Sequence, residues 1–441
     1  MNFLKAAAFF GFAAGLLAQT GAYGGPSVLS RGKAASNRDL GPASALRPYL
    51  YLNGIYDNGL TPVSVDQTGQ VPRDDVYGGE AGVGLYGYRR WKQTLLGVDY
   101  RGNFRHYSRK TYYDGSDHAL ALDFTHQPSR RVTFGLRQSA GTFSRSFGWL
   151  PNPGIFDPTY SHIPADEIFD NRTNYLSTRG DLTWQKSLRL SFNAGGEGFM
   201  VRRRSNALFG VTGYTARGDI SYRLGRHSTI GVDYNFLHFD FVRVFGASDL
   251  HMVAINYARR LSPTWEIALR LGGGRIETQS LRQVRIDPVV AAIIGQQVGI
   301  ETFHQLHYVP HGGIRLAKTF RSANLQLAYD RTVSPGNGVL LTSRAEQARV
   351  SYSFTGLRYW NFGLNAGYSA MHSVTHLVGS YEGYHGGWGA TRRLGKNFHA
   401  IARFDARRYD MGGLRQQFDR VMYRATLGIA FSPGDMPLSL W

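Results

Sequence analysis

Apolar and polar residues alternate along most of this chain with a period of two. One run shows the pattern well, with apolar residues at Ile230, Val232, Tyr234 and Phe236 and polar residues at Asp233 and Asn235. Alternate side chains of a β-strand point to opposite faces, whereas a helix would repeat every three to four residues. Helical periodicity is nearly absent. The pattern therefore predicts an all-β protein.

The alternating runs divide the chain into eighteen predicted strands, with sixteen as the alternative count. They begin near Pro48, Val76, Thr94, Ala119, Arg131, Asn174, Leu188, Val211, Thr229, His251, Thr264, Leu306, Ala323, Val339, Trp360, Leu377, Phe398 and Arg420. Short basic connections alternate with connections of variable length, of which 144–171 is the longest. An even number of strands with short turns at one end and longer loops at the other is typical of a transmembrane barrel. A soluble sandwich or propeller does not predict this alternation.

We therefore expect a transmembrane antiparallel up-and-down β-barrel, with short periplasmic turns and longer extracellular loops. The barrel is predicted to span residues 47–432, after a flexible segment at 23–46 and before a C-terminal tail at 433–441. Residues 1–22 combine one base, Lys5, with a short apolar run and small residues, which is the pattern of a secretory signal peptide. Its cleavage is expected after residue 18 or 22.

The last predicted strand resembles the closing strand of the porin-like outer-membrane β-barrel superfamily. It alternates Tyr423, Leu427 and Ile429 and ends at the aromatic Phe431, although a tail that ends in Trp441 follows. No subfamily motif accompanies this resemblance, which is architectural and covers the predicted mature chain. It implies a location in the outer membrane of a Gram-negative-type envelope, with outer-membrane lipids and the barrel-assembly machinery as partners. It is also compatible with an oligomer.

The net charge of +19 becomes informative once the basic residues are assigned to turns or to strand faces. The short turns and their edges carry many bases, such as Arg89 and Lys92, and no acid. On the inner faces of the strands, parity places twelve arginines against eleven acids, among them Glu382, so the wall is nearly neutral. A basic rim of this kind suits contacts with anionic lipid headgroups, whereas nucleic-acid binding would need clustered bases. Trp91, Trp184, Trp265 and Trp360 also adjoin short turns, where membrane interfaces favour tryptophan.

The longest predicted loop is the main candidate for a functional segment. It is rich in proline and aromatic residues and carries four acids. The resemblance to porins implies that such a loop folds inward and faces a ladder of arginines. The residues predicted to form the lumen and its constriction are Arg101, Arg105, Arg137, Arg179, Arg217, Arg270, Arg315 and Arg403 on the wall and Asp157, Asp166, Glu167 and Asp170 on the loop. A lid over the mouth is the alternative. A second loop, 279–301, includes a candidate short helix at 288–294.

Motifs for catalysis are weak. Gly82, Gly84 and Gly87 form G-x-G-x-x-G, but no helix follows, so the motif is interpreted as close packing in the wall. His304, His307 and His311 are spaced as if to line one wall, and they are interpreted as ordinary polar residues. We predict no catalytic, cofactor-binding or metal-binding residues and no enzyme. The leading hypothesis is a passive, weakly charge-selective channel for small hydrophilic solutes. The alternatives are a secretion conduit for an anionic exopolysaccharide and an outer-membrane barrel enzyme.

Overall fold

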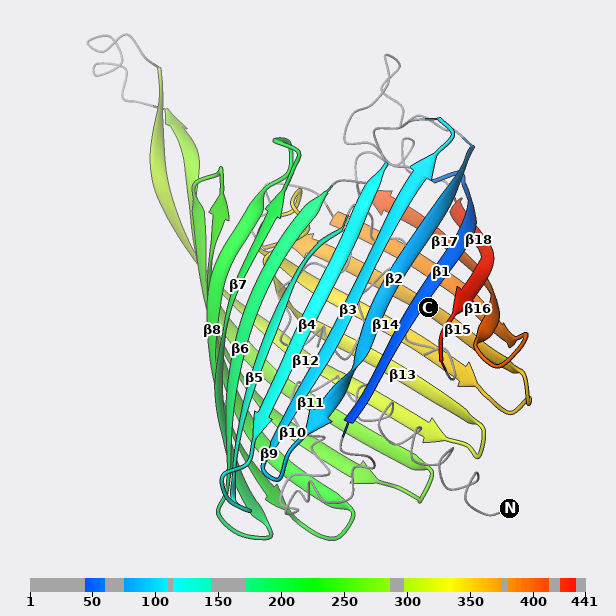
Figure 1. The fold of residues 1–441 in the computed structure, drawn as a ribbon. Coiled ribbons are helices and arrows are strands. Elements are labelled where there is room, and N and C mark those ends of the chain that lie inside the picture. The colour runs from blue at the N-terminus through cyan, green and yellow to red at the C-terminus, as the bar shows by residue number, and fades with distance from the viewer. Residues whose placement is uncertain are drawn as a thin grey trace.

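The computed structural model describes residues 44–59, 75–109, 114–143, 172–285, 297–374, 380–411 and 421–433. These residues form eighteen strands in one antiparallel sheet, shown in Figure 1. The strands are β1 (Ser44–Asp57), β2 (Val76–Arg90), β3 (Thr94–Tyr107), β4 (Gly115–His126), β5 (Val132–Phe143), β6 (Thr173–Gln185), β7 (Leu190–Arg203), β8 (Gly210–Arg223), β9 (Ser228–Val242), β10 (Gly246–Arg260), β11 (Trp265–Arg285), β12 (Val298–Thr319), β13 (Ala323–Ser334), β14 (Ser343–Phe354), β15 (Trp360–Ser373), β16 (Ser380–Arg393), β17 (Phe398–Met411) and β18 (Val421–Phe431).

Each strand pairs with its neighbours in the sequence, and β1 also pairs with β18 from Leu50↔Phe431 to Asp57↔Arg424. The last pairing closes the sheet into a barrel, so the predicted fold and the count of eighteen strands are confirmed. Short turns join the strands at one end, which we call the short-turn end, and the other connections lie at the long-loop end. Among the described residues no helix is long and apolar enough to cross a membrane.

Two strands extend further than predicted. β11 continues to Arg285 and β12 begins at Val298, so both ends of the predicted loop 279–301, residues 279–285 and 298–301, belong to a long hairpin that rises from the barrel wall (Figure 1). The prediction was wrong because strand residues above the apolar band do not contact lipid. Apolar and polar residues therefore need not alternate after Thr278, and the polar run resembles a loop. The signal peptide, most of the predicted flexible segment, the short helix at 288–294 and most of the C-terminal tail lie outside the described residues.

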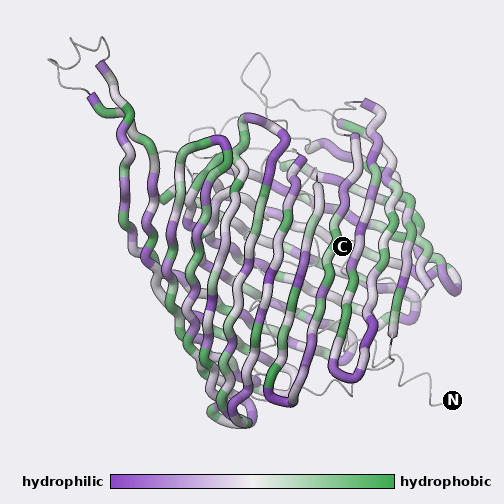
Figure 2. Tube along the Cα trace, turned by 60° about the vertical axis from the view of Figure 1, so that its left-hand side comes forward, coloured by the Kyte–Doolittle hydropathy of each residue, from purple (hydrophilic) through white to green (hydrophobic). Residues whose placement is uncertain are grey.

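The outer face of the barrel is apolar and exposed. Leu52 and Leu427 are 68% and 69% exposed, whereas alternate residues such as Tyr49 and Ala430 are buried on the inner face. The alternation of apolar and polar positions along each strand is visible in Figure 2. Water would not favour this exposed apolar surface, but lipid would. The wall is therefore built to cross a membrane.

Aromatic side chains border this apolar surface at both ends. At the short-turn end, Trp91, Trp184 and Trp360 are exposed, and the Arg392 guanidinium lies 5.2 Å from the centroid of the Trp360 ring. At the other border, exposed tyrosines include Tyr77, Tyr214 and Tyr384. Rings of this kind occupy the two lipid headgroup levels of membrane barrels. The two aromatic borders therefore mark the part of the wall that contacts acyl chains.

One predicted side-chain direction was wrong. Glu382 was expected to face inward, but its neighbour Tyr381 is buried in the interior and Glu382 stands at the opposite parity. β16 contains small residues at both parities, including Gly383 and Gly386, so its apolar face could not be recognised from the sequence.

The exposed leucine at position 427 gives a test of the inside and outside assignment. Leu427 lies on β18 midway between Tyr423 and Phe431, which border the apolar band, whereas Thr426 faces inward. We expect Leu427→Arg to lower the free energy of unfolding from lipid by about 2 to 4 kcal/mol, because the charge would enter hydrocarbon. Thr426→Arg should cost less than half as much. The measurement is reversible folding into lipid vesicles, and equal costs for the two variants would contradict the assignment.

Candidate functional site: the charged interior and its inward loop

Arginines and carboxylates form ion pairs on the inner face of the first strands. Arg424 of β18 donates to Glu80 of β2 at 2.6 Å, and the hydroxyl group of Tyr51 donates to the same carboxylate at 3.0 Å. Arg105 pairs with Asp117, and both side chains are 2% exposed. Buried charges of opposite sign are stable only when they are paired in this way. The interior wall is therefore charged but locally neutral.

The same arrangement continues around the barrel. Asp181 of β6 accepts hydrogen bonds from both Arg179, at 2.9 Å, and Arg217 of the neighbouring hairpin. Arg270 of β11 donates to Asp233 of β9 at 2.5 Å across the intervening strand β10. These bonds link strands that are far apart in the sequence. They hold each guanidinium group against the wall instead of extended into the interior.

The connection between β13 and β14, residues 335–342, folds into a tight loop. Gly336 and Gly338 have φ values of +83° and +91°, which few residues other than glycine adopt without strain. The Asn337 carboxamide oxygen accepts from the backbone N–H groups of Val339 at 3.3 Å and Leu340 at 3.1 Å. A side chain at position 336 would meet the Leu340 carbonyl oxygen at 1.7 Å. Glycine is therefore required at this turn.

This loop lies against inward-facing residues of strands that are not its neighbours in the sheet. The Thr342 and Ser248 hydroxyl oxygens are 2.6 Å apart, and Ser248 belongs to β10. The backbone N–H of Phe209, from the β7–β8 connection, donates to the Gly338 carbonyl oxygen at 2.9 Å. Leu340 is buried in one cluster with Met422 of β18 and other side chains of β15–β17. The loop therefore reaches across the interior and narrows it.

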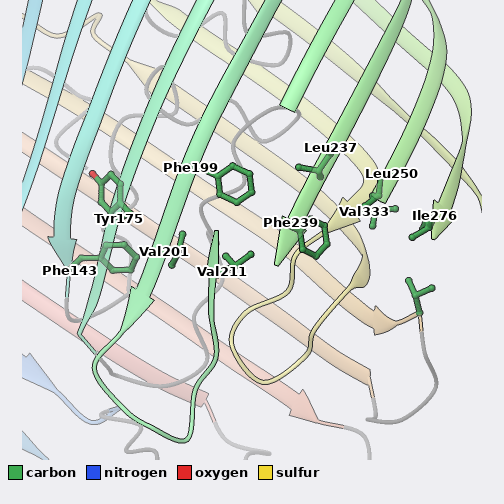
Figure 3. Packing of buried hydrophobic residues seen from close by; sticks show 11 residues of the cluster. Phe143, Tyr175, Phe199, Val201, Val211, Leu237, Phe239, Leu250, Ile276 and Val333 are labelled. Carbon is green, nitrogen blue, oxygen red and sulfur yellow. The ribbon is translucent and has the colours of Figure 1, made fainter. Parts of the chain in front are cut away.

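Apolar side chains line one side of the interior near the long-loop end. A cluster of eleven buried residues draws on β5 to β11 and includes Phe199, Phe239 and Leu250. Figure 3 shows Val333 of β13, next to the inward loop, in the same group as Leu250 and Ile276. This cluster anchors the base of the loop. The interior consequently has an apolar side near the mouth and ion pairs elsewhere on the wall.

The structure places the eight predicted wall arginines at inward-facing positions. Seven of them form an ion pair with an aspartate of the wall. The eighth, Arg315, also interacts with other residues. The four predicted loop acids, Asp157, Asp166, Glu167 and Asp170, lie outside the described residues. The inward position of the loop 144–171 therefore stays a prediction.

Sequence reasoning missed the inward loop 335–342 and the arginine nearest to it. Arg203 is 4% exposed and lies beside Gly338, where its side-chain Nε is 2.7 Å from an added Cβ. The predicted strand start near Val339 was wrong, because β14 begins only at Ser343. Val339 and Leu340 are apolar because they pack in the interior, not because they belong to a strand. The one usable signal was the pair of glycines on either side of an asparagine, which predicts a tight turn but not its direction.

The weak motifs have structural roles. The rings of Tyr51 and Tyr49 occupy the spaces that side chains at Gly82 and Gly84 would fill, so this glycine motif permits close packing of β1 and β2. His307 and His311 face inward, but His304 stands at the opposite parity, so the three do not line one wall. No group of three metal-binding side chains occurs in the part of the chain that the structure describes.

The closed sheet, its apolar exterior and its charged interior define the class of protein: a membrane-spanning antiparallel β-barrel. No family model matches the chain, and no curated protein does. Solved structures with a similar fold include OpdQ of Pseudomonas aeruginosa, with a TM-score of 0.41, 10% identity and 88% and 97% of the two chains covered. OccK2 of the same organism, in complex with glucuronate, has a TM-score of 0.43 and 13% identity, with 89% of this chain and 98% of that chain covered. A BenF-like porin from Pseudomonas fluorescens has a TM-score of 0.43 and 10% identity, with 88% of this chain and 98% of that chain covered. At these identities the likeness concerns the fold alone.

The contact between Ser248 and Thr342 allows a direct test of the loop position. The chain has no cysteine, so the double variant Ser248→Cys/Thr342→Cys would have only these two thiols. Because the two hydroxyl oxygens are 2.6 Å apart, we expect a disulfide to form on mild oxidation. Mass spectrometry of peptides would detect it. The control is Ser248→Cys/Ser432→Cys, whose second residue lies beside the short-turn end, and crosslinking of the control alone would contradict the docked loop.

Proposed function

We propose that this protein is a passive channel for small hydrophilic solutes in the outer membrane of a Gram-negative-type envelope. The closed sheet supports this proposal, because such a barrel satisfies its backbone hydrogen bonds within the membrane. The apolar outer face and its aromatic borders also support it. No step of chemistry on the solute is part of the proposal.

The observation that carries the proposal is the inward loop across a wall of ion pairs. A barrel of eighteen strands is wide enough to enclose an aqueous passage, and a loop that crosses it restricts the size of the solute. Pairs that are open to water, such as Arg137 and Asp123, offer hydrogen-bond donors and acceptors to a polar solute. The local pairing leaves little net field along the path, so selectivity by charge should be mild.

The same pairing argues against a conduit for an anionic polysaccharide. Such a polymer would need arginines free to bind its carboxylates, but Arg270 and Arg424 already donate to Asp233 and Glu80. Displacement of these carboxylates would leave them buried without partners, which is costly. A neutral or weakly charged small solute meets no such barrier.

Two partners follow from this proposal. Outer-membrane lipids would surround the apolar band, and the barrel-assembly machinery would insert the chain. The alternating apolar residues of β18 support recognition by that machinery, although the terminal signal could also include Trp441. Cleavage of a signal peptide near residue 18 or 22 belongs to the same proposal.

Single-channel recordings in planar bilayers test the proposal and identify the constriction. Purified protein should give steady ohmic steps. Replacement of residues 336–341 by two glycines should increase the conductance, because the variant lacks Leu340, whose side chain is buried across the interior with Met422. Deletion of 150–167 should also increase it if that predicted loop folds inward. Silence of the intact protein would overturn the channel proposal, whereas unchanged conductance of a deletion variant would overturn the role of that loop alone.

Charge selectivity gives a second test. The Arg137 and Asp123 side chains are 34% and 37% exposed, so this pair is open to water on the inner face. Asp123→Asn removes one negative charge from the water-exposed inner wall beside Arg137 and should shift the reversal potential in a salt gradient toward anions. The shift should be larger in 0.1 M than in 1 M salt, because the screening length falls from about 10 Å to about 3 Å.

The control for this variant is Glu277→Gln, which removes one negative charge from the outward face of β11. It should leave the reversal potential unchanged. An equal shift in the two variants, or a shift in Asp123→Asn that does not depend on salt, would contradict a selectivity that arises from the inner wall.

A further inference from the structure

The outer face of the barrel has a hollow near the long-loop end, where β6 to β9 lie side by side (Figure 1). Its volume is about 500 Å³, and its lining includes Leu176, Gly198, Met200, Tyr214, His238 and Asp240. These residues stand at even positions on strands whose odd positions face inward. The hollow therefore opens toward the surroundings of the barrel and is separate from the interior.

The hollow exists because side chains are missing from its floor. A Cβ added at Gly198 would have no atom within 4 Å. Gly198 pairs with Thr178 of β6, and Gly180, two residues further along β6, is equally open. Leu176 and Tyr214 stand on either side and are 43% and 53% exposed. Tyr214 belongs to the aromatic border at the long-loop end. The floor consequently begins at the headgroup level and continues toward the acyl chains.

Exposed positive charge lies directly above the hollow. Arg202 stands two residues beyond Met200 on the same face of β7, which is about 7 Å along a strand. Arg204 directly follows β7 and Arg243 directly follows β9, and the Arg243 guanidinium donates to the Ser205 carbonyl oxygen at 3.1 Å. None of the three forms an ion pair with another described residue.

The nearby acids are differently arranged. Asp249 and Asp240 lie 2.7 Å and 3.2 Å from the two ring nitrogens of His238, on the side of the hollow next to β10. These carboxylates can share the protons of one imidazole, and they stand below the arginines. Among the described residues, the charge above the hollow that forms no ion pair is therefore positive. Asp240 lies in the same row as Met200, one outward-facing position below Arg202.

We propose that this hollow binds a lipid with a phosphorylated headgroup. One acyl chain lies over Gly198 and Gly180, between Leu176 and Tyr214, and the phosphate contacts the three arginines. Guanidinium groups match phosphate oxygens in geometry and charge, and such contacts strengthen at the edge of a membrane, where water is scarce. The three arginines complement an anionic headgroup, and the open glycine floor admits its chain.

The test compares two lipids with the same acyl chains. Purified protein in detergent is incubated with dioleoyl phosphatidic acid or with dioleoylglycerol, and bound lipid is measured by native mass spectrometry. We expect phosphatidic acid to bind about tenfold more tightly or better, because only this lipid offers a phosphate to the arginines. Equal retention of the two lipids would overturn the proposal. Displacement of phosphatidic acid by an equal concentration of inorganic phosphate would also overturn it.

Two variants separate the headgroup contact from the chain contact. Arg202→Gln/Arg204→Gln/Arg243→Gln should weaken phosphatidic acid binding about tenfold, and its control is Arg130→Gln/Arg226→Gln/Arg321→Gln at the short-turn end. Gly198→Leu fills the hollow and should weaken binding with all arginines present. Its control is Gly386→Leu, at an outward-facing glycine whose added Cβ meets only the Asn365 carbonyl oxygen at 3.8 Å.

Each outcome decides for or against the proposal. Loss of binding in both test variants with retention in both controls supports it. Equal loss in the arginine control would indicate general attraction to the basic surface, and unchanged binding by Gly198→Leu would indicate that no chain occupies the hollow. Either result overturns the proposal. Channel conductance does not enter this experiment, so its outcome is independent of the proposed function.

Discussion

The pairing of β1 with β18 is the constraint on which the rest of this structure depends. Eight residue pairs, from Leu50↔Phe431 to Asp57↔Arg424, connect the two ends of the sheet. Backbone groups at an open edge would have no partner within a membrane, and closure removes that cost for all strands together. Once the sheet is closed, each strand has one face toward lipid and one toward the interior. Every other feature of the wall follows from this division.

The interior face must then accommodate polar groups, some of which have no access to bulk water. The chain does this by placing arginines beside carboxylates on neighbouring strands, as with Glu80 and Arg424 or Asp181 and Arg217. Such pairs contribute little net stability, because removing two charges from water costs about as much as their attraction returns. Their consequence is functional. They make the surface polar while they limit its net field.

The inward loop shows how a short connection can control a wide barrel. Residues 335–342 carry no charged side chain, and two glycines with positive φ turn the chain back into the interior. Once inside, Leu340 is buried with side chains of the opposite part of the wall, and the Thr342 hydroxyl group contacts Ser248. The apolar burial supplies the stabilisation, and the hydrogen bonds set the direction. The outer hollow above Gly198 arises in a comparable way, from small residues on the other face of the same wall.

The sequence by itself determined the strands and the faces of most of them, because period-two alternation is imposed locally by lipid on one side and polar surroundings on the other. It indicated Leu427 as outward and Arg101 as inward, and the structure places both there. It failed where the lipid constraint is absent, as in β11 beyond Thr278, or where small residues occupy both faces, as at Glu382. Only the tertiary structure decided that the loop 335–342 lies in the interior. Its partners, Ser248, Phe209 and Met422, are far away in the sequence, and no local pattern encodes contacts that form only when the barrel closes.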